Sequence, residues 1–367
     1  MKMGLGTVRI VKTIGKGGTS VVYLVRDVQN NREYALKRII VATPVAKDDC
    51  EREIKYMKGF NHPNIVPILH AEVKRIGGLG FEYFIVMEYC PSTLLDNMNQ
   101  VAGTTRLSEK EILLIFEQIL SGVIYLHTRN PPVIHRDLIV DNIFVSVDGK
   151  HKIGDLGSCT TSQYNPQGLL PIQLQALREY IYEKTTPSYR SPEMINFYNM
   201  KRIGPKADIW ALGCLLYTMC FYINPFERQN AQGEYDAAEC EKAIKDVDYV
   251  YPTEEEWILA ERERVEILQR MRALQKRKEQ DKKNGNKFND LNDPDQQFLL
   301  QMNLNDEEYE SALEMREMYS LELLALIDFM LEPDPDVRPN ALQVMARLCT
   351  ILKKSYPKEL KRKTQNQ

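Results

Sequence analysis

Hydrophobic and polar positions alternate along residues 7–41, and this alternation indicates β-strands near the start of the chain. The β-branched residues gather in three clusters separated by turn sequences: Val8–Ile10, Val21–Val25 and Tyr34–Ile40. Phe81–Glu88 predicts another strand, whereas residues 48–59 have the spacing of a helix. We therefore expect residues 1–88 to form a small, mostly β lobe with one helix.

Beyond residue 88 the apolar positions recur with helical spacing. Ser108 and Glu111 make a capping box, so we expect a helix from this point to His127. The spacing of apolar residues predicts three more helices, at Asp208–Ile223, Ser320–Leu331 and Ala341–Leu352. The pattern therefore predicts an α+β fold in which residues 89–356 form a larger helical lobe, followed by a basic tail at 357–367.

One stretch, residues 237–319, does not have the composition of a compact lobe. It is highly charged and contains an uninterrupted run of helix formers, Glu254–Lys283, whose apolar residues make only a narrow stripe. This pattern favours a solvated helical insertion on the surface, with a coiled segment that binds a partner as the alternative. Asn284-Gly285-Asn286 should end the helix.

Charge and cysteine content narrow the class of protein. The 48 basic and 51 acidic residues nearly balance, so composition gives no indication of a nucleic-acid partner. The 7 cysteines form no C-x-x-C pair, which is typical of reduced thiols in a cytoplasmic protein. We expect no signal peptide and no myristoyl anchor. We also expect no transmembrane segment, because the longest apolar run, Ala211–Ile223, is too short to span a bilayer. Composition leaves the oligomeric state open.

Two neighbouring segments carry residues suited to phosphoryl transfer, Ile134–Asn142 and Lys152–Gly157. The first contains Asp137, a carboxylate that can orient a hydroxyl nucleophile and collect its proton. Asn142 and Asp155 supply hard oxygen ligands, which suit Mg²⁺, or Mn²⁺ in its place, bridging the phosphates of ATP. Each acid alone is typical of a turn, but the ordered set predicts transfer of the γ-phosphoryl group of ATP to an alcohol.

The residues expected to hold the phosphates lie earlier in the chain. Gly15, Gly17 and Gly18 lie between two predicted strands, where backbone N–H groups can close over phosphates, although such a turn is also typical of a plain hairpin. Lys37 lies on the next strand, and a buried lysine there is costly unless it faces anions. Glu53, on the predicted helix, can pair with Lys37 and hold it in place. The alternative is that Lys37 is a surface residue of an edge strand.

The order of these motifs resembles that of the eukaryotic protein kinases over nearly the whole chain. The further motifs that carry the resemblance are His135-Arg136-Asp137, Asp155-Leu156-Gly157, Ser191-Pro192-Glu193, Asp208 and Arg338. The resemblance implies one bilobal kinase domain over 8–352 and an ion pair between Arg338 and Glu193. It also implies that Thr186 contacts Asp137, and it favours Ser or Thr hydroxyls of protein substrates as phosphate acceptors.

The same resemblance implies a set of residues around ATP. Met87 would be the gatekeeper, and Glu88-Tyr89-Cys90 would be the hinge that binds adenine. Val22, Ala35 and Phe144 would enclose the purine. The complete set expected to contact the nucleotide is Ile14, Gly15, Gly17, Gly18, Val22, Ala35, Lys37, Met87, Glu88, Cys90 and Phe144.

A narrower resemblance is to the Numb-associated kinase family. The segments that carry it are Leu94–Gln100, Gly157–Thr161, Pro166-Gln167 and Glu183–Met194. That family has an extra helix after its activation segment, and here Pro171–Lys184 has the spacing of an amphipathic helix. Its apolar face would contain Leu170, Leu174, Leu177 and Ile181. The resemblance implies clathrin-adaptor subunits as substrates, a role in membrane traffic, and a place in the cytoplasm or at the periphery of membranes.

Ile139 departs from the kinase pattern, which has a lysine two residues after the catalytic aspartate to contact the γ-phosphate. An apolar side chain cannot neutralise developing charge, and Asp141 adds a negative charge nearby. Leu156 replaces the commoner Phe and should serve as an apolar plug. We therefore expect weak kinase activity. The first alternative is a pseudokinase scaffold that barely turns over, and the second is a small-molecule or lipid kinase.

Arg136, beside Asp137, needs a counter-anion. Four residues near in sequence could supply one if they were phosphorylated: Thr160, Thr161, Ser162 and Tyr164. The family resemblance favours the alternative, in which the extra helix keeps the activation segment ordered without phosphate.

Overall fold

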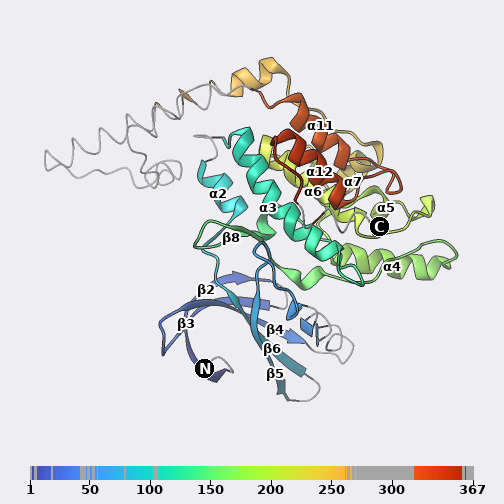
Figure 1. Cartoon of the computed structure of the whole chain (residues 1–367). Coiled ribbons are helices and arrows are strands. Elements are labelled where there is room, and N and C mark those ends of the chain that lie inside the picture. Colours follow the sequence, from blue (N-terminus) through green and yellow to red (C-terminus); the bar gives the residue numbers. More distant parts are fainter. Residues whose placement is uncertain are drawn as a thin grey trace, which may run out of the picture.

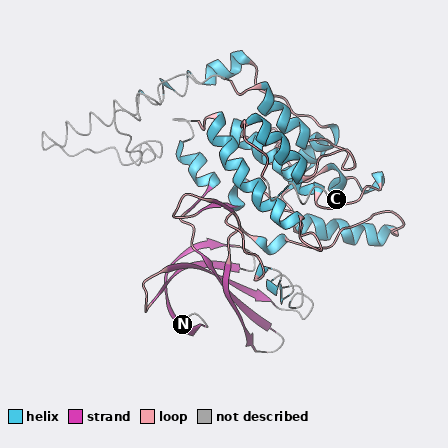
Figure 2. Ribbon diagram, viewed as in Figure 1, coloured by secondary structure: helices cyan, strands magenta, loops and turns pink. Residues whose placement is uncertain are grey.

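The computed structural model of the chain describes residues 2–3, 6–17, 20–41, 57–77, 80–101, 106–260 and 318–357. It also describes positions 47, 50–51, 54–55, 262, 265–266, 269 and 360. The strands gather in one lobe and most helices in the other (Figure 1, Figure 2). This arrangement confirms the expected α+β bilobal fold.

A six-stranded antiparallel sheet forms the smaller lobe, with the strand order β1-β2-β3-β4-β6-β5. The strands are β1 (Lys2–Met3), β2 (Gly6–Lys16), β3 (Ser20–Asp27), β4 (Glu33–Val41), β5 (Ile68–Ile76) and β6 (Gly80–Glu88). Alternate residues point to opposite faces. Leu36 and Val86 are therefore buried on one face, while Tyr83 and Ile85 pack on the other against Cys50 and Ile54. The described positions between 47 and 57 are helical.

The larger lobe is built around two long helices, α3 and α6, which lie side by side in Figure 1 and contact each other. Its helices are α2 (Leu94–Val101), α3 (Glu109–His127), α4 (Pro171–Glu183), α5 (Pro192–Ile195), α6 (Lys206–Phe221), α7 (Ala237–Asp246), α11 (Leu321–Met330) and α12 (Ala341–Ile351). The capping box of Ser108 and Glu111 starts α3 as predicted. α6 is apolar on all sides and is buried along its length, which is typical of a helix at the centre of a lobe. None of the described helices is long and apolar enough to cross a membrane.

The described residues also form a small second sheet and four short 3-10 helices. The sheet has the order β7-β8-β9, and its strands are β7 (Ser92–Thr93), β8 (Ile143–Val145) and β9 (His151–Ile153). The 3-10 helices are η1 (Val140–Asn142), η2 (Leu156–Ser158), η3 (Pro187–Tyr189) and η4 (Phe197–Asn199). Because the hairpin of β8 and β9 joins the two motif-bearing segments, it brings Asn142 and Asp155 together.

The start of the charged stretch 237–319 is packed into the larger lobe. α7 buries Ala243 and Ile244 in the lobe core, and Trp257 is buried there as well. The sequence pattern predicts a solvated helical insertion for 237–319, and these few apolar positions are hard to recognise among its charged residues. Positions 254–260 are helical, as are 262, 265–266 and 269. The rest of Glu254–Lys283 and Asn284-Gly285-Asn286 lie outside the described residues.

Candidate active site

A cavity of about 350 Å³ opens between the six-stranded sheet and the loops of the larger lobe. Its lining includes ten of the residues expected to contact the nucleotide: Ile14, Gly15, Gly17, Val22, Ala35, Lys37, Met87, Glu88, Cys90 and Phe144. The remaining one, Gly18, lies outside the described residues. Asn142 and Asp155 line the same cavity from the larger lobe. The structure thus brings the two groups of predicted residues to one site.

Strand register explains how the sheet supplies its share of the lining. Ala35 pairs with Leu24 on β3 and with Met87 on β6, so these strands place Ala35 beside the hinge. Lys37 is two residues further along β4 and therefore points to the same face as Ala35. The lining combines apolar side chains, among them Val22 and Phe144, with the charged Lys37 and Asp155. Such a lining suits a ligand that has both an apolar ring and charged phosphates.

Lys37 and Asp155 form an ion pair across this cavity. Lys37 Nζ lies 2.6 Å from Asp155 Oδ1, and the two side chains are 20% and 47% exposed. Desolvation would raise the pKa of Asp155, but the Lys37 ammonium opposes it. Together with smaller contributions from His135 and the backbone of Gly157, the ammonium keeps the pKa below its ordinary value. Asp155 is therefore ionised at neutral pH and available as an oxygen ligand. Glu53 lies outside the described residues, so its pairing with Lys37 stays a prediction.

Asp137 is held through both of its carboxylate oxygens. Thr186 Oγ1 donates to Oδ1 over 2.6 Å, and Asn142 Nδ2 donates to Oδ2 over 2.9 Å. Asn142 Nδ2 also donates to the backbone carbonyl of Asp137. These bonds connect the catalytic loop (residues 134–142) with the activation segment (residues 155–193). The two bonds therefore restrict rotation of the Asp137 carboxylate.

Asp208, in α6, holds the backbone of the catalytic loop. Its carboxylate accepts the N–H groups of His135 and Arg136, both over 2.8 Å, and it lies 2.7 Å from His127 Nε2. Burial would raise the pKa of Asp208, but these bonds outweigh it and keep the pKa below its ordinary value. Arg136 has a φ of 73°, a strained conformation for a residue with a side chain. The bonds from Asp208 stabilise that conformation.

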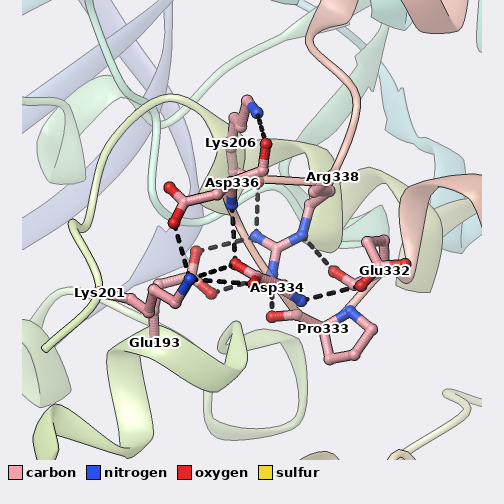
Figure 3. A network of polar contacts seen from close by, with 8 residues as sticks. All are labelled: Glu193, Lys201, Lys206, Glu332, Pro333, Asp334, Asp336 and Arg338. Atoms are coloured by element: carbon pink, nitrogen blue, oxygen red, sulfur yellow. Dashed lines mark hydrogen bonds and ion pairs between the residues drawn. The ribbon is translucent and has the colours of Figure 1, made fainter. Parts of the chain in front are cut away.

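A buried ion pair ties the end of the activation segment to the loop before α12. Arg338 Nη1 and Nη2 bind the two carboxylate oxygens of Glu193 over 2.8 and 2.9 Å, and both side chains are almost completely buried. The remaining donors of Arg338 bind the backbone carbonyls of Lys206, Glu332 and Pro333. Figure 3 shows these contacts, together with Lys201 between two aspartates of the same loop. The pairing of Arg338 with Glu193 agrees with the expectation from the sequence.

The oxygen ligands present fit a divalent cation that is shared with a nucleotide. Among the described residues there is no group of three or more His, Cys, Asp or Glu that could hold a metal ion alone. Mg²⁺ commonly binds one or two protein oxygens together with substrate phosphates, and Asn142 and Asp155 line the cavity where phosphates would lie. The two residues therefore suit a metal that arrives with ATP.

Two pairings at the site could not be predicted from the sequence. Lys152 Nζ binds both carboxylate oxygens of Glu88 over 2.9 and 2.6 Å, which fixes the hinge to β9. His127 binds Asp208 at the end of α3, where a histidine is also expected simply from the helix dipole. Neither pairing has a local signal, because the partners lie far apart in sequence.

Residues 8–348 match the family model described as the protein kinase domain. The chain belongs to the protein kinase family. The match covers both lobes of this kinase and includes every described residue of the site.

Three relatives of this kinase also carry kinase names. Two are proteins of Dictyostelium discoideum named as probable serine/threonine-protein kinases. One is 38% identical over 237 residues (64% of this chain, 21% of the relative), and the other is 37% identical over 226 residues (60% and 28%). The third, the actin-regulating kinase PRK1 of Saccharomyces cerevisiae, is 34% identical over 241 residues (64% and 29%). The matched region is thus less than a third of each relative.

Proposed function

We propose that this chain is a serine/threonine protein kinase that transfers the γ-phosphoryl group of ATP to Ser or Thr hydroxyls of proteins. The observation that carries the proposal is the position of Asp137, which Thr186 and Asn142 hold beside a cavity that contains Lys37 and Asp155. Family membership and the kinase names of the relatives agree with it.

Each residue at the site has a role in this proposal. Lys37 binds the α- and β-phosphates, and Glu53 keeps Lys37 in place. Asn142 and Asp155 hold Mg²⁺, or Mn²⁺, which neutralises phosphate charge when it is bound. Asp137 orients the acceptor hydroxyl and receives its proton.

Thr186 supports a Ser or Thr acceptor rather than a small molecule or lipid. It lies in the segment that precedes the Glu193–Arg338 pair, and it contacts Asp137 directly. A segment anchored at both ends beside the catalytic carboxylate can support a peptide in an extended conformation. This arrangement does not favour a lipid or small-molecule kinase.

The function is tested by ADP release from the purified chain with MgATP and a degenerate Ser/Thr peptide array. We expect turnover that Asp137→Ala abolishes, and we expect Lys37→Met to weaken ATP binding. Phosphate incorporation that is equal in wild type and Asp137→Ala would contradict the proposal, because it would come from a contaminating enzyme.

Ile139 favours a second candidate function, a pseudokinase scaffold that binds ATP with little turnover. The residue lies in the catalytic loop between Asp137 and Asn142, where a cation is expected to face the γ-phosphate. Nucleotide binding by calorimetry together with undetectable ADP release would favour the scaffold over the enzyme.

We further propose that this kinase belongs to the Numb-associated family and acts on clathrin-adaptor subunits in membrane traffic. The support is the helix α4, which follows the activation loop where the family resemblance places an extra helix. The proposed location is the cytoplasm, with peripheral attachment to membranes. Phosphorylation of purified adaptor subunits, compared with unrelated proteins of similar Ser and Thr content, tests the substrate, and imaging of the tagged chain tests the location.

A further inference from the structure

Arg136 is buried beside the catalytic aspartate with one nitrogen unsatisfied. The residue is 6% exposed. Its Nε donates to the backbone carbonyl of Ser158, but its buried Nη1 has no hydrogen-bond partner within the described part of the chain. A buried guanidinium in this state needs a compensating partner of another kind.

The ring of Tyr180 supplies such a partner. The guanidinium carbon of Arg136 lies over the ring, 5.0 Å from its centre. Tyr180 belongs to α4, and Tyr164 packs edge-on against it with ring centres 6.0 Å apart. The negative face of an aromatic ring attracts a cation, and the attraction grows when water is excluded.

We propose that Tyr180 is a positioning residue of the active site, and that its ring holds Arg136 where a phosphate or carboxylate would otherwise be needed. The inference rests on the proposed kinase function and deepens it. Arg136 adjoins Asp137 in the catalytic loop, and its bond to Ser158 joins that loop to the activation segment. The ring of Tyr180 therefore fixes the catalytic carboxylate and the start of the activation segment together.

The activation segment is already docked by its backbone, which agrees with a phosphate-independent arrangement. Thr160 forms an antiparallel bridge with Ile134 of the catalytic loop, with hydrogen bonds of 2.9 and 2.8 Å. Tyr164 forms a second bridge with Ile203. The hydroxyl of Thr160 accepts the N–H of Ser162, so it is engaged within its own turn. Such backbone pairing can order the segment without a phosphate.

The proposal is tested with three substitutions of Tyr180 in the full chain. Tyr180→Phe keeps the ring, Tyr180→Leu keeps an apolar side chain without it, and Tyr180→Glu replaces the ring with a carboxylate. We expect Tyr180→Leu to lower kcat about tenfold with little change in KM for ATP, whereas Tyr180→Phe and Tyr180→Glu retain kcat. Equal kcat for the Phe and Leu variants, or a Glu variant as impaired as the Leu variant, would overturn the proposal. Ile172→Ala, at an exposed position of α4, is the matched control.

A double-mutant cycle of Arg136→Met and Tyr180→Leu tests the contact without measuring catalysis. We expect the two substitutions to be non-additive in the free energy of unfolding, because each removes the same contact. Additive effects on the free energy of unfolding would show that the two side chains do not interact, and would overturn the proposal. If the wild-type chain has no turnover, the proposed function fails, but the cycle still decides whether the ring holds the arginine.

Treatment with a phosphatase provides the last test. Full kcat after complete dephosphorylation, verified by mass spectrometry, would support the aromatic partner. Loss of activity, restored by phosphorylation at Thr160, Thr161, Ser162 or Tyr164, would show that an anion holds Arg136 and would overturn the proposal.

Discussion

Thr186 Oγ1 donates a hydrogen bond of 2.6 Å to Oδ1 of Asp137, across the gap between the activation segment and the catalytic loop. Asn142 fixes the other carboxylate oxygen. With both oxygens held, the Asp137 side chain has little rotational freedom. The hydroxyl of Thr186 therefore couples the placement of the activation segment to the orientation of the Asp137 carboxylate.

Thr186→Val tests this coupling, because valine has nearly the same shape but no hydroxyl. Loss of a hydrogen bond to a charged group costs about 1.5–3 kcal/mol, so we expect kcat to fall roughly 10- to 100-fold. Thr186→Ser keeps the hydroxyl and should retain most of the activity. Steady-state kinetics with saturating MgATP checks both variants, and a Val variant with unchanged kcat would contradict the role.

The strands around the site could be predicted because each buries apolar residues on a regular face. β4 places Leu36 in the core and Lys37 toward the cavity, and this alternation is visible in the sequence. β5 was not predicted, because Leu69 and Val73 remain half exposed and its alternation is correspondingly weak. Strand pairing, rather than local pattern, determines that element.

The predicted helix at Pro171–Lys184 is confirmed as α4 (Pro171–Glu183), but its contact with the catalytic loop was not predictable. The expected apolar stripe is only partly buried, since Ile181 is in the core and Leu170 is exposed. The contact of Tyr180 with Arg136 joins residues from separate segments. Sequence order can place motifs, but such contacts depend on how the segments pack.

Ile139→Lys should raise the turnover of this kinase. A lysine at this position would face the γ-phosphate and stabilise the charge that develops during transfer, a preorganised contact worth roughly tenfold or more in rate. ADP release under saturating ATP measures the effect. Ile139→Met, which lengthens the side chain without adding charge, is the control. An unchanged kcat in the lysine variant would show that the missing cation does not limit this enzyme.

Asp208→Asn should destabilise the fold above about pH 4 and have a smaller effect in acid. The pKa of Asp208 is held below its ordinary value of 3.8, so the unfolded state binds the proton more readily. The stabilisation from the carboxylate is complete above pH 3.8 and is lost as the pH falls through the lowered pKa. Replacing the charged acceptor by an amide costs about 2 kcal/mol or more at neutral pH.

Urea unfolding of the wild type and Asp208→Asn, from pH 7 downward, measures this dependence. The difference between their unfolding free energies isolates the contribution of Asp208 from that of the other carboxylates that titrate in the same pH range. We expect the difference to be constant near neutral pH and to shrink below about pH 4. A difference that grows in acid would mean that the pKa of Asp208 is raised rather than lowered.

The Glu193–Arg338 pair should be worth far more to the fold than the neighbouring Lys201 contacts in Figure 3. Arg338→Met leaves the carboxylate of Glu193 buried without a partner, and breaking a buried ion pair from one side costs about 3–5 kcal/mol. The double variant Arg338→Met/Glu193→Leu removes both charges and should recover part of that loss.

Lys201→Ala provides the matched control for this comparison, because Lys201 binds Asp334 and Asp336 at the surface of the same loop. Water screens those contacts, so the unfolding free energy should change little. Guanidinium unfolding of the three variants and the wild type checks the order of their unfolding free energies. A lysine variant as unstable as Arg338→Met would mean that the whole loop, and not the buried pair, anchors the activation segment. A double variant less stable than Arg338→Met would mean that Glu193 has a favourable partner beyond the arginine.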